Sequence, residues 1–205
     1  MPAQVQRMPL WLAVGITVVV ALPFGLLLKG FNLVLWIAFT VWGVYLALGG
    51  TPAAARRLLP AYAGGAASGA LVHMFALALS SWITTPRWTF DNGALIVPVT
   101  IAYFVGFCVV VWWMRFSDVV QASSLAYFTG IALTLGAVFT GMGDTGYVGH
   151  SPNQYVYVIG ALVVSVLSSV LGCAIAALSV WLNGVRQPAP EAAAAPVGTA
   201  EAQPA

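Results

Sequence analysis

Six apolar runs, each about as long as a bilayer is thick, constrain the fold of this chain more than any other feature. They cover residues 9–28, 31–48, 59–83, 94–114, 119–139 and 155–182. A helix needs roughly 20 apolar residues to cross the hydrocarbon core of a membrane. Only 6% of the residues are charged, whereas soluble domains carry about 25% to cover a water-facing surface. We therefore expect an all-α, polytopic membrane bundle of six transmembrane helices.

The segments outside these runs divide the chain into three parts. Residues 1–8 form a short N-terminal segment, and residues 9–183 form the six-helix transmembrane domain. Residues 187–205 are rich in Pro and Ala and lack apolar periodicity, which predicts a disordered tail. The first run is longer than the apolar core of a signal peptide, which spans about 7–15 residues. We therefore expect this run to remain in the protein as its first helix.

The distribution of the seven cations predicts how the bundle is oriented. With the N-terminus inside, the outer segments hold Lys29 and Arg87. The inner segments hold the other five: Arg7, Arg56, Arg57, Arg115 and Arg186. Because Lys and Arg favour the cytoplasmic side, we expect both termini in the cytoplasm. Seven scattered cations form no nucleic-acid surface, so a nucleic-acid partner is excluded.

Residues 139–150, which we call the outer glycine turn, separate the last two runs. The turn contains Phe139, Gly141, Gly143, Asp144 and His150, and it has no Lys or Arg. Glycine permits a positive φ and close backbone approach, so the sequence predicts a compact, shaped turn. Two interpretations of the acid stay open: Asp144 approaches His150 across the turn, or it caps the turn through its own backbone.

Small residues mark one face of the third run and one face of the last. Gly65 and Gly69 form a G-x-x-x-G pair, and Gly172 continues a face of serines and alanines. Such faces let helix backbones approach closely in lipid. The pattern fits packing inside the chain and also contact with a second copy or another protein. Residues 61–67 also resemble residues 126–132, which suggests an internal repeat.

The interior of the runs offers few groups that could carry a function. Every Asp, Glu, Lys and Arg lies at or beyond a predicted run end, while His73 lies near the middle of the third run. A polar group at that depth is costly unless it is paired, so His73 is a candidate gate or solute ligand. The alternative is a neutral histidine bonded to a neighbouring helix. Other candidates for a solute path, with core packing as the alternative, are Tyr62, Tyr103, Tyr127, Ser165 and Ser168.

Motifs for catalysis and for metal binding are missing from the sequence. It contains no His-Glu-x-x-His, no Gly-x-Ser-x-Gly and no Gly-Lys-Ser/Thr phosphate loop. Cys108 and Cys173 have no zinc-ligand spacing, and the outer loops add only Asp91 to the acid and histidine of the outer glycine turn. We expect a protein that is not an enzyme and that holds neither a cofactor nor a metal.

One family resembles this chain. The pattern Phe139-x-Gly141-x-Gly143-Asp144, the Gly49-Gly50 corner before a basic segment, and Ser68-Gly69 are similar to the YcdZ-like family of small bacterial inner-membrane proteins. The similarity runs from the first run to Trp181. The family is a domain of unknown function. The resemblance implies a multi-span protein of the bacterial inner (plasma) membrane and no particular chemistry.

Two functions fit these patterns. The first is a channel or transporter for a small neutral or weakly polar solute, because a charged substrate would need a compensating charge at depth. The second is a structural or accessory membrane subunit that docks a partner through its small-residue faces. The expected partners are the lipid bilayer, a small-molecule solute and a second copy of the chain.

Overall fold

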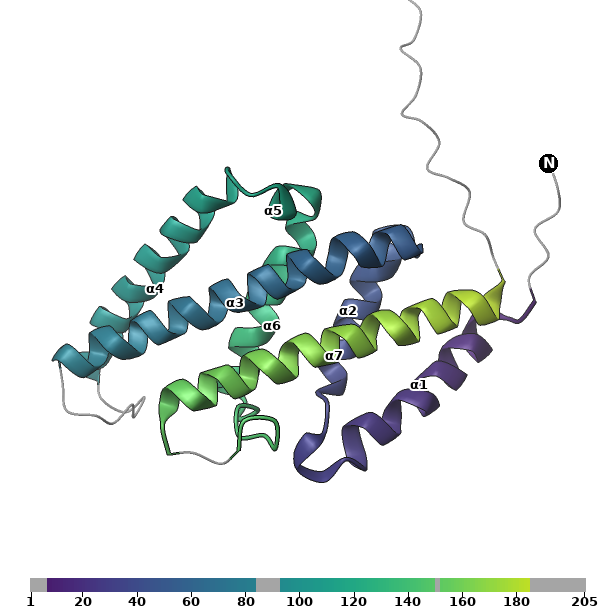
Figure 1. Ribbon diagram of the computed structural model, residues 1–205, viewed down its shortest axis with the longest axis horizontal. Coiled ribbons are helices and arrows are strands. Elements are labelled where there is room, and N and C mark those ends of the chain that lie inside the picture. The colour runs from purple at the N-terminus through teal and green to yellow at the C-terminus, as the bar shows by residue number, and fades with distance from the viewer. Residues whose placement is uncertain (1–6, 84–92, 150–151, 185–205) are drawn as a thin grey trace, which may run out of the picture.

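In the computed structural model, residues 7–83, 93–149 and 152–184 are described, and every regular element in these ranges is a helix (Figure 1). The predicted all-α class is therefore confirmed. The elements are α1 Leu10–Leu26, the 3-10 turn η1 Lys29–Phe31, α2 Leu35–Ala47, α3 Pro52–Ile83, α4 Gly93–Met114, α5 Asp118–Ala122, α6 Ser124–Phe139 and α7 Gln154–Asn183. Outside the described residues lie segment 1–6, the tail from 185, Arg87, Asp91 and His150.

Several helices are long and apolar enough for a membrane protein. Three stretches are long and apolar enough to span a bilayer: Lys29–Ala47, Pro52–Leu79 and Gln154–Asn183. Shorter apolar helices cover Leu10–Leu26, Thr100–Met114 and Ser124–Phe139. Large apolar side chains face outward, with Trp11 74% and Phe104 70% exposed, and lipid suits such a surface better than water. The number of spans and their orientation remain predictions.

Two helices differ from the runs that predicted them. The helix predicted over 59–83 begins at Pro52, where Thr51 Oγ1 accepts a hydrogen bond from the amide of Ala54 (3.3 Å). Proline suits a first helical position because no amide donor is needed there. The helix predicted over 119–139 is divided into α5 and α6 at Ser123, whose hydroxyl accepts a bond from the amide of Ala126 (3.4 Å). Serine in this capping position begins a new helix.

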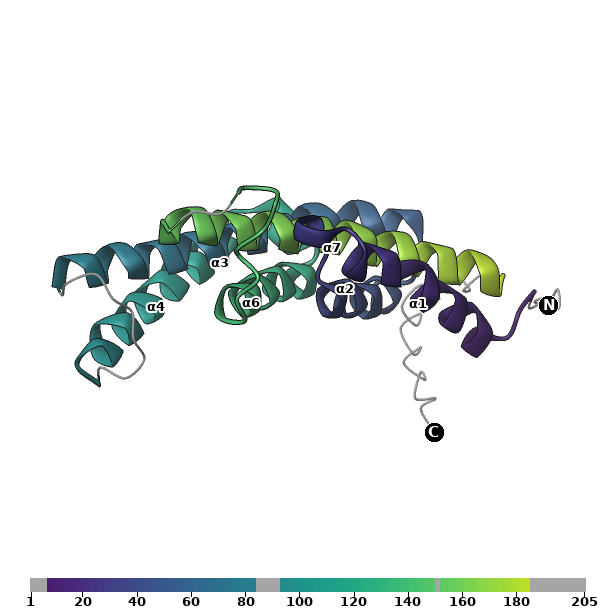
Figure 2. The same cartoon turned by 90° about the horizontal axis from the view of Figure 1, so that it is seen from below.

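The two long helices lie side by side at the centre of the molecule and run in opposite directions (Figure 1). The first, α3, packs against α4 and α6, which follow it in the chain. The second, α7, packs against α1 and α2, which precede it by more than a hundred residues. A half-turn about the line of sight in Figure 1 exchanges α3 with α7, α1 with α4 and α2 with α6. Seen from below, α3 and α7 form one layer and α2 and α6 lie on one side of it (Figure 2).

The crossing of α3 and α6 depends on glycine. A Cβ atom on Gly65 would overlap the carbonyl of Tyr127, and one on Gly130 would overlap the carbonyl of Tyr62. Both helices therefore bring a bare backbone to the contact, which brings them closer together than side chains would allow. Segments 61–67 and 126–132, which the sequence suggests as copies of a repeat, are thus neighbours across this crossing.

The crossing of α7 and α2 follows the same plan. A Cβ atom on Gly172 would lie 2.5 Å from the carbonyl oxygen of Ala38, so this helix pair also requires a glycine. One turn earlier, Ser168 Oγ accepts a hydrogen bond of 2.8 Å from the amide of Val34, the residue before α2. This bond satisfies a backbone donor at a helix start that has no partner within its own helix.

Candidate functional site

Hydrogen bonds between buried hydroxyl groups join the three helices α3, α6 and α7. The hydroxyl of Tyr62 on α3 lies 2.8 Å from Ser165 Oγ on α7. Thr134 Oγ1 on α6 donates to the same serine oxygen at 2.9 Å. All three side chains are fully buried. We call these three residues the central junction. Tyr62 and Ser165, predicted as candidates for a solute path, therefore lie in a closed contact among α3, α6 and α7.

Two further candidates from the sequence, Tyr127 and Ser168, also lie in helix contacts. The hydroxyl of Tyr127 is 2.6 Å from Ser68 Oγ, which also donates to the carbonyl of Gly64 (2.9 Å). Ser168 Oγ accepts the hydrogen bond from the amide of Val34. Both Tyr127 and Ser168 are fully buried. Each of them joins two helices, and neither lines a described cavity.

His73 is the candidate that does face a cavity. It lies on α3 and is 6% exposed. Its Nδ1 is hydrogen-bonded to the hydroxyl of Tyr103 on α4. Its ring meets Phe139, the last residue of α6, edge-on with the ring centroids 5.6 Å apart. Because α3 starts earlier than predicted, His73 lies in the C-terminal third of the helix, level with the end of α6.

A pocket of about 320 Å³ opens beside His73, and we call it the His73 pocket. Three helices contribute to it: α3, the end of α6 and the start of α7. Its lining consists of His73, Leu77, Val138, Phe139, Gln154, Tyr157 and Val158. The pocket therefore joins residues that are far apart in the sequence.

The lining of the His73 pocket is neutral and mixed in polarity. Its polar groups are an imidazole, an amide and a phenol, from His73, Gln154 and Tyr157, and none of the lining residues is an acid, a lysine or an arginine. The Tyr157 hydroxyl donates to the carbonyl of Val138 (3.1 Å), which fixes its ring beside the pocket. A small solute with hydrogen-bonding groups and no charge suits this surface, because a charged one would lose its hydration without gaining an opposite charge.

The outer glycine turn packs directly on α7 beside this pocket. Gly141 and Gly149 have positive φ values of 85° and 76°, as a tight turn of this kind requires. A Cβ atom on Gly143 would overlap the carbonyl of Tyr157, and one on Gly160 would overlap the carbonyl of Gly143. The backbone of the turn therefore lies against the backbone of α7, and glycine is needed on both sides of the contact.

The same turn is also held by the corner between α1 and α2. The amide of Gly146 donates to the carbonyl of Gly30 at 2.7 Å, and the hydroxyl of Tyr147 donates to the carbonyl of Phe31 at 2.7 Å. The rings of Phe31 and Tyr147 meet edge-on at 5.2 Å. The outer glycine turn thus bridges the first and last parts of the chain, while Asp144 is exposed at its surface.

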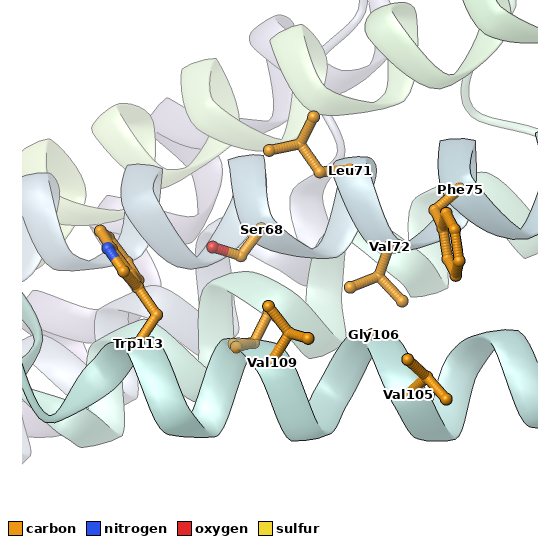
Figure 3. Close-up of a pocket in the computed structure, with 9 residues that line it drawn as sticks. Ser68, Leu71, Val72, Phe75, Val105, Gly106, Val109 and Trp113 are labelled. Carbon is orange, nitrogen blue, oxygen red and sulfur yellow. The ribbon is translucent and has the colours of Figure 1, made fainter.

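A larger cavity of about 410 Å³ lies between α3 and α4. Figure 3 shows Trp113 at one end and Phe75 at the other, with Val72, Val109 and Gly106 between them. Its lining is almost wholly apolar, and several of its side chains are exposed on the outer face of the molecule. Hydrocarbon suits such a groove better than water, which needs two to four polar partners. The smaller His73 pocket is therefore the better candidate for a polar ligand.

Sequence reasoning found His73 and Phe139 but missed most of the residues beside them. Gln154 and Tyr157 look like ordinary interfacial residues at a helix start, and Val138 looks like any apolar helix residue. Only the packing of α6 and α7 against α3 brings them together. Among the residues that the structure describes, no three His, Cys, Asp or Glu side chains lie close enough to hold a metal.

Comparison of this chain with protein-family models, with curated proteins and with solved structures finds no match.

Proposed function

We propose that this chain is a bacterial inner-membrane protein with six spans and two cytoplasmic termini that transports a small neutral or weakly polar solute. The observation that carries the proposal is the His73 pocket. It combines three neutral hydrogen-bonding groups with an apolar wall at the end of three apolar helices. Ligand sites in membrane transporters commonly lie where helices from different parts of the chain meet.

The ends of the described chain support an even number of spans. The amide of Arg7 donates to the carbonyl of Asn183, the last residue of α7, at 3.1 Å. The first and last helices therefore have their free ends at the same side of the molecule. A cation also suits the C-terminal end of a helix, where the helix dipole is negative. With the excess of Lys and Arg at this side, both termini are assigned to the cytoplasm.

The central junction favours a gated transporter over an open channel. The side chains of Tyr62, Thr134 and Ser165 are fully buried where α3, α6 and α7 meet, so they interrupt any passage along the axis of the bundle. A solute that enters the His73 pocket crosses only if the helices move apart at this point. We assign Tyr62 and Ser165 to this gate.

The alternative function, an accessory subunit, has less support. Gly65, Gly69 and Gly172 were its expected docking points, and each of them faces the backbone of another helix in the same chain. Their small-residue faces are thus occupied within one molecule. A second copy or another protein would have to bind elsewhere.

The test is solute uptake by liposomes that contain the purified full-length chain. The panel of probes consists of urea, acetamide, glycerol and short alcohols, with uptake followed by light scattering during liposome swelling. Gln154→Leu removes a polar group from the pocket. The uptake rate should fall about tenfold, because the solute loses one hydrogen bond in the transition state for its passage. Gln121→Leu is the matched control, because this exposed glutamine on α5 donates to the carbonyl of Arg115 (3.0 Å) outside the pocket, and it should leave uptake unchanged.

Two results would contradict the proposal. The first is swelling no faster than that of empty liposomes for every solute in the panel. The second is equal loss of uptake in Gln154→Leu and Gln121→Leu, because the pocket would then have no special part in the process.

A further inference from the structure

The burial patterns of the two long helices match position by position, which extends the match seen between whole helices. When Gly69 of α3 is aligned with Gly172 of α7, each buried residue of 58–76 falls on a buried residue of 161–179. Tyr62 then falls on Ser165, so the hydrogen bond between them joins equivalent positions. A bond of that kind lies on the axis that relates the two halves.

The shorter helices match at five of the seven buried positions of α6. When Tyr127 of α6 is aligned with Val34, Ile131 falls on Ala38 and Val138 falls on Tyr45, and all of these residues are buried. The contacts between helices correspond as well. Gly69 faces the carbonyl of Ile131, just as Gly172 faces the carbonyl of Ala38.

Together with the exchange of α1 and α4 in Figure 1, the match relates α1, α2 and α3 to α4, α6 and α7. Three spans in each half place the second half upside down relative to the first, because an odd number of crossings ends on the opposite side. The axis between them then lies in the plane of the membrane. Repeats of this inverted kind build transporters in which one half rocks against the other around a shared site.

The symmetry gives the His73 pocket a counterpart at the cytoplasmic side. The pocket lies between α3, the end of α6 and the start of α7. Its counterpart lies between α7, the end of α2 and the start of α3. There Ala176 takes the place of His73, Ala54 takes the place of Tyr157, and Tyr45 takes the place of Val138.

The central positions of this counterpart are filled by buried side chains. Tyr45 is 2% exposed, and Ala54 and Ala176 are buried as well. The large ring of Tyr45 occupies the position at which the other half carries the smaller Val138. The His73 pocket is therefore open at one end of the molecule, while a buried tyrosine occupies the equivalent position at the other end, as expected for one of two alternating states.

We propose that a second, cytoplasmic solute site forms around Tyr45, Ala54 and Ala176 when the two halves exchange conformations, and that the outer pocket closes in the same step. The site takes the same class of ligand as the His73 pocket, a small uncharged solute. The proposal rests on the proposed transport function for its ligand. The exchange of conformations rests on the matched halves and is measured separately.

The experiment follows the reactivity of single cysteines toward a membrane-impermeant maleimide. Cys108 and Cys173 are first replaced by Ser and Ala, and Ala54→Cys then reports on the cytoplasmic site. In a separate chain, Leu77→Cys reports on the outer pocket, which Leu77 lines. We expect Ala54→Cys to react only from the side that carries the termini, and Leu77→Cys only from the opposite side.

The decisive variants place the residue of one half at the equivalent position of the other half. Val138→Tyr fills the outer pocket, so it should slow the reaction of Leu77→Cys and speed that of Ala54→Cys, at the far end of the molecule, by about tenfold for a shift of one decade in the equilibrium. Tyr45→Val should also speed the reaction of Ala54→Cys. Leu125→Tyr, on an exposed face of α6, is the control and should change neither rate.

Failure of the inference is distinct from failure of the transport function. If Val138→Tyr leaves Ala54→Cys as slow as before, while size-exclusion chromatography shows folded protein, the halves do not alternate and the inference is wrong. This holds even if liposomes take up solute. If the two cysteines respond oppositely but no solute crosses, the alternation stands and the transport function is wrong.

Discussion

Gly65 and its neighbour across the crossing determine how closely α3 and α6 approach. Because a Cβ on Gly65 would overlap the carbonyl of Tyr127, Gly65→Ala forces the two helices apart. We expect the free energy of unfolding to fall by about 1–3 kcal/mol, the usual cost of overpacking. Gly43→Ala is the control, since its new methyl group meets no atom within 4 Å. Thermal unfolding in mild detergent, followed by size-exclusion chromatography, measures both. Equal melting temperatures would contradict this close approach.

The hydroxyl of Tyr62 gives a second test at this scale. Tyr62→Phe removes its bond to Ser165 and leaves the ring in place. The loss should lower the free energy of unfolding by about 1 kcal/mol, the size found for hydrogen bonds between membrane helices. Tyr155→Phe, on an exposed residue at the start of α7, should have no effect. If the bond also closes the gate, Tyr62→Phe should raise solute uptake in the same liposomes.

Single residues show what the sequence could and could not reveal. His73 was identifiable because a titratable group among apolar residues has few reasons to be there. The roles of Tyr62 and Ser165 were not identifiable, because a sequence does not show whether a hydroxyl lies in a helix contact or lines a passage. Gln154 and Tyr157 were missed for a related reason. They join His73 only through the packing of α7 against α3.

Among the elements, the outer glycine turn offers the clearest prediction. Gly143→Ala places a methyl group against the carbonyl of Tyr157, so the turn must lift away from α7. Hydrogen exchange at the turn and at the start of α7 should then become faster by about tenfold, for a local loss of some 1.4 kcal/mol. Met142→Ala, at an exposed neighbour in the same turn, should exchange as the unaltered protein does. Unchanged exchange in Gly143→Ala would show that the turn does not depend on this contact.

Helix boundaries show why apolar runs predict elements better than they predict ends. The run over 59–83 predicted a helix correctly. Its first turns were interpreted as a loop, because they contain the charged residues Arg56 and Arg57. Hydropathy does not reveal that charged residues beyond an apolar run belong to the same helix. The division at Ser123 was equally hidden, because a serine cap within an apolar stretch looks like one more small residue. Both helix starts depend on a hydrogen bond from a backbone amide to a side-chain hydroxyl, which hydropathy does not reveal.

On the scale of the whole molecule, the structure matches other segments than those that look alike in the sequence. Residues 61–67 and 126–132 look alike because both bring a tyrosine and a glycine to the same crossing. The halves that do correspond, with α3 matching α7, share almost no residue types along their buried faces. What they share is which positions are buried and which carbonyl each small residue faces. Such a match becomes visible only in three dimensions.

The way α3 and α7 pack has a consequence for how the polypeptide assembles. Each long helix belongs to one half by chain order, yet packs chiefly on the short helices of the other. Fragments divided between α3 and α4 would therefore each expose the surface meant for its complement. We expect either fragment, expressed alone, to be degraded, and the two, expressed together with separate affinity tags, to co-purify as one particle. We therefore expect the covalent link between α3 and α4 to be dispensable for folding, because each fragment supplies the surface that the other must bury.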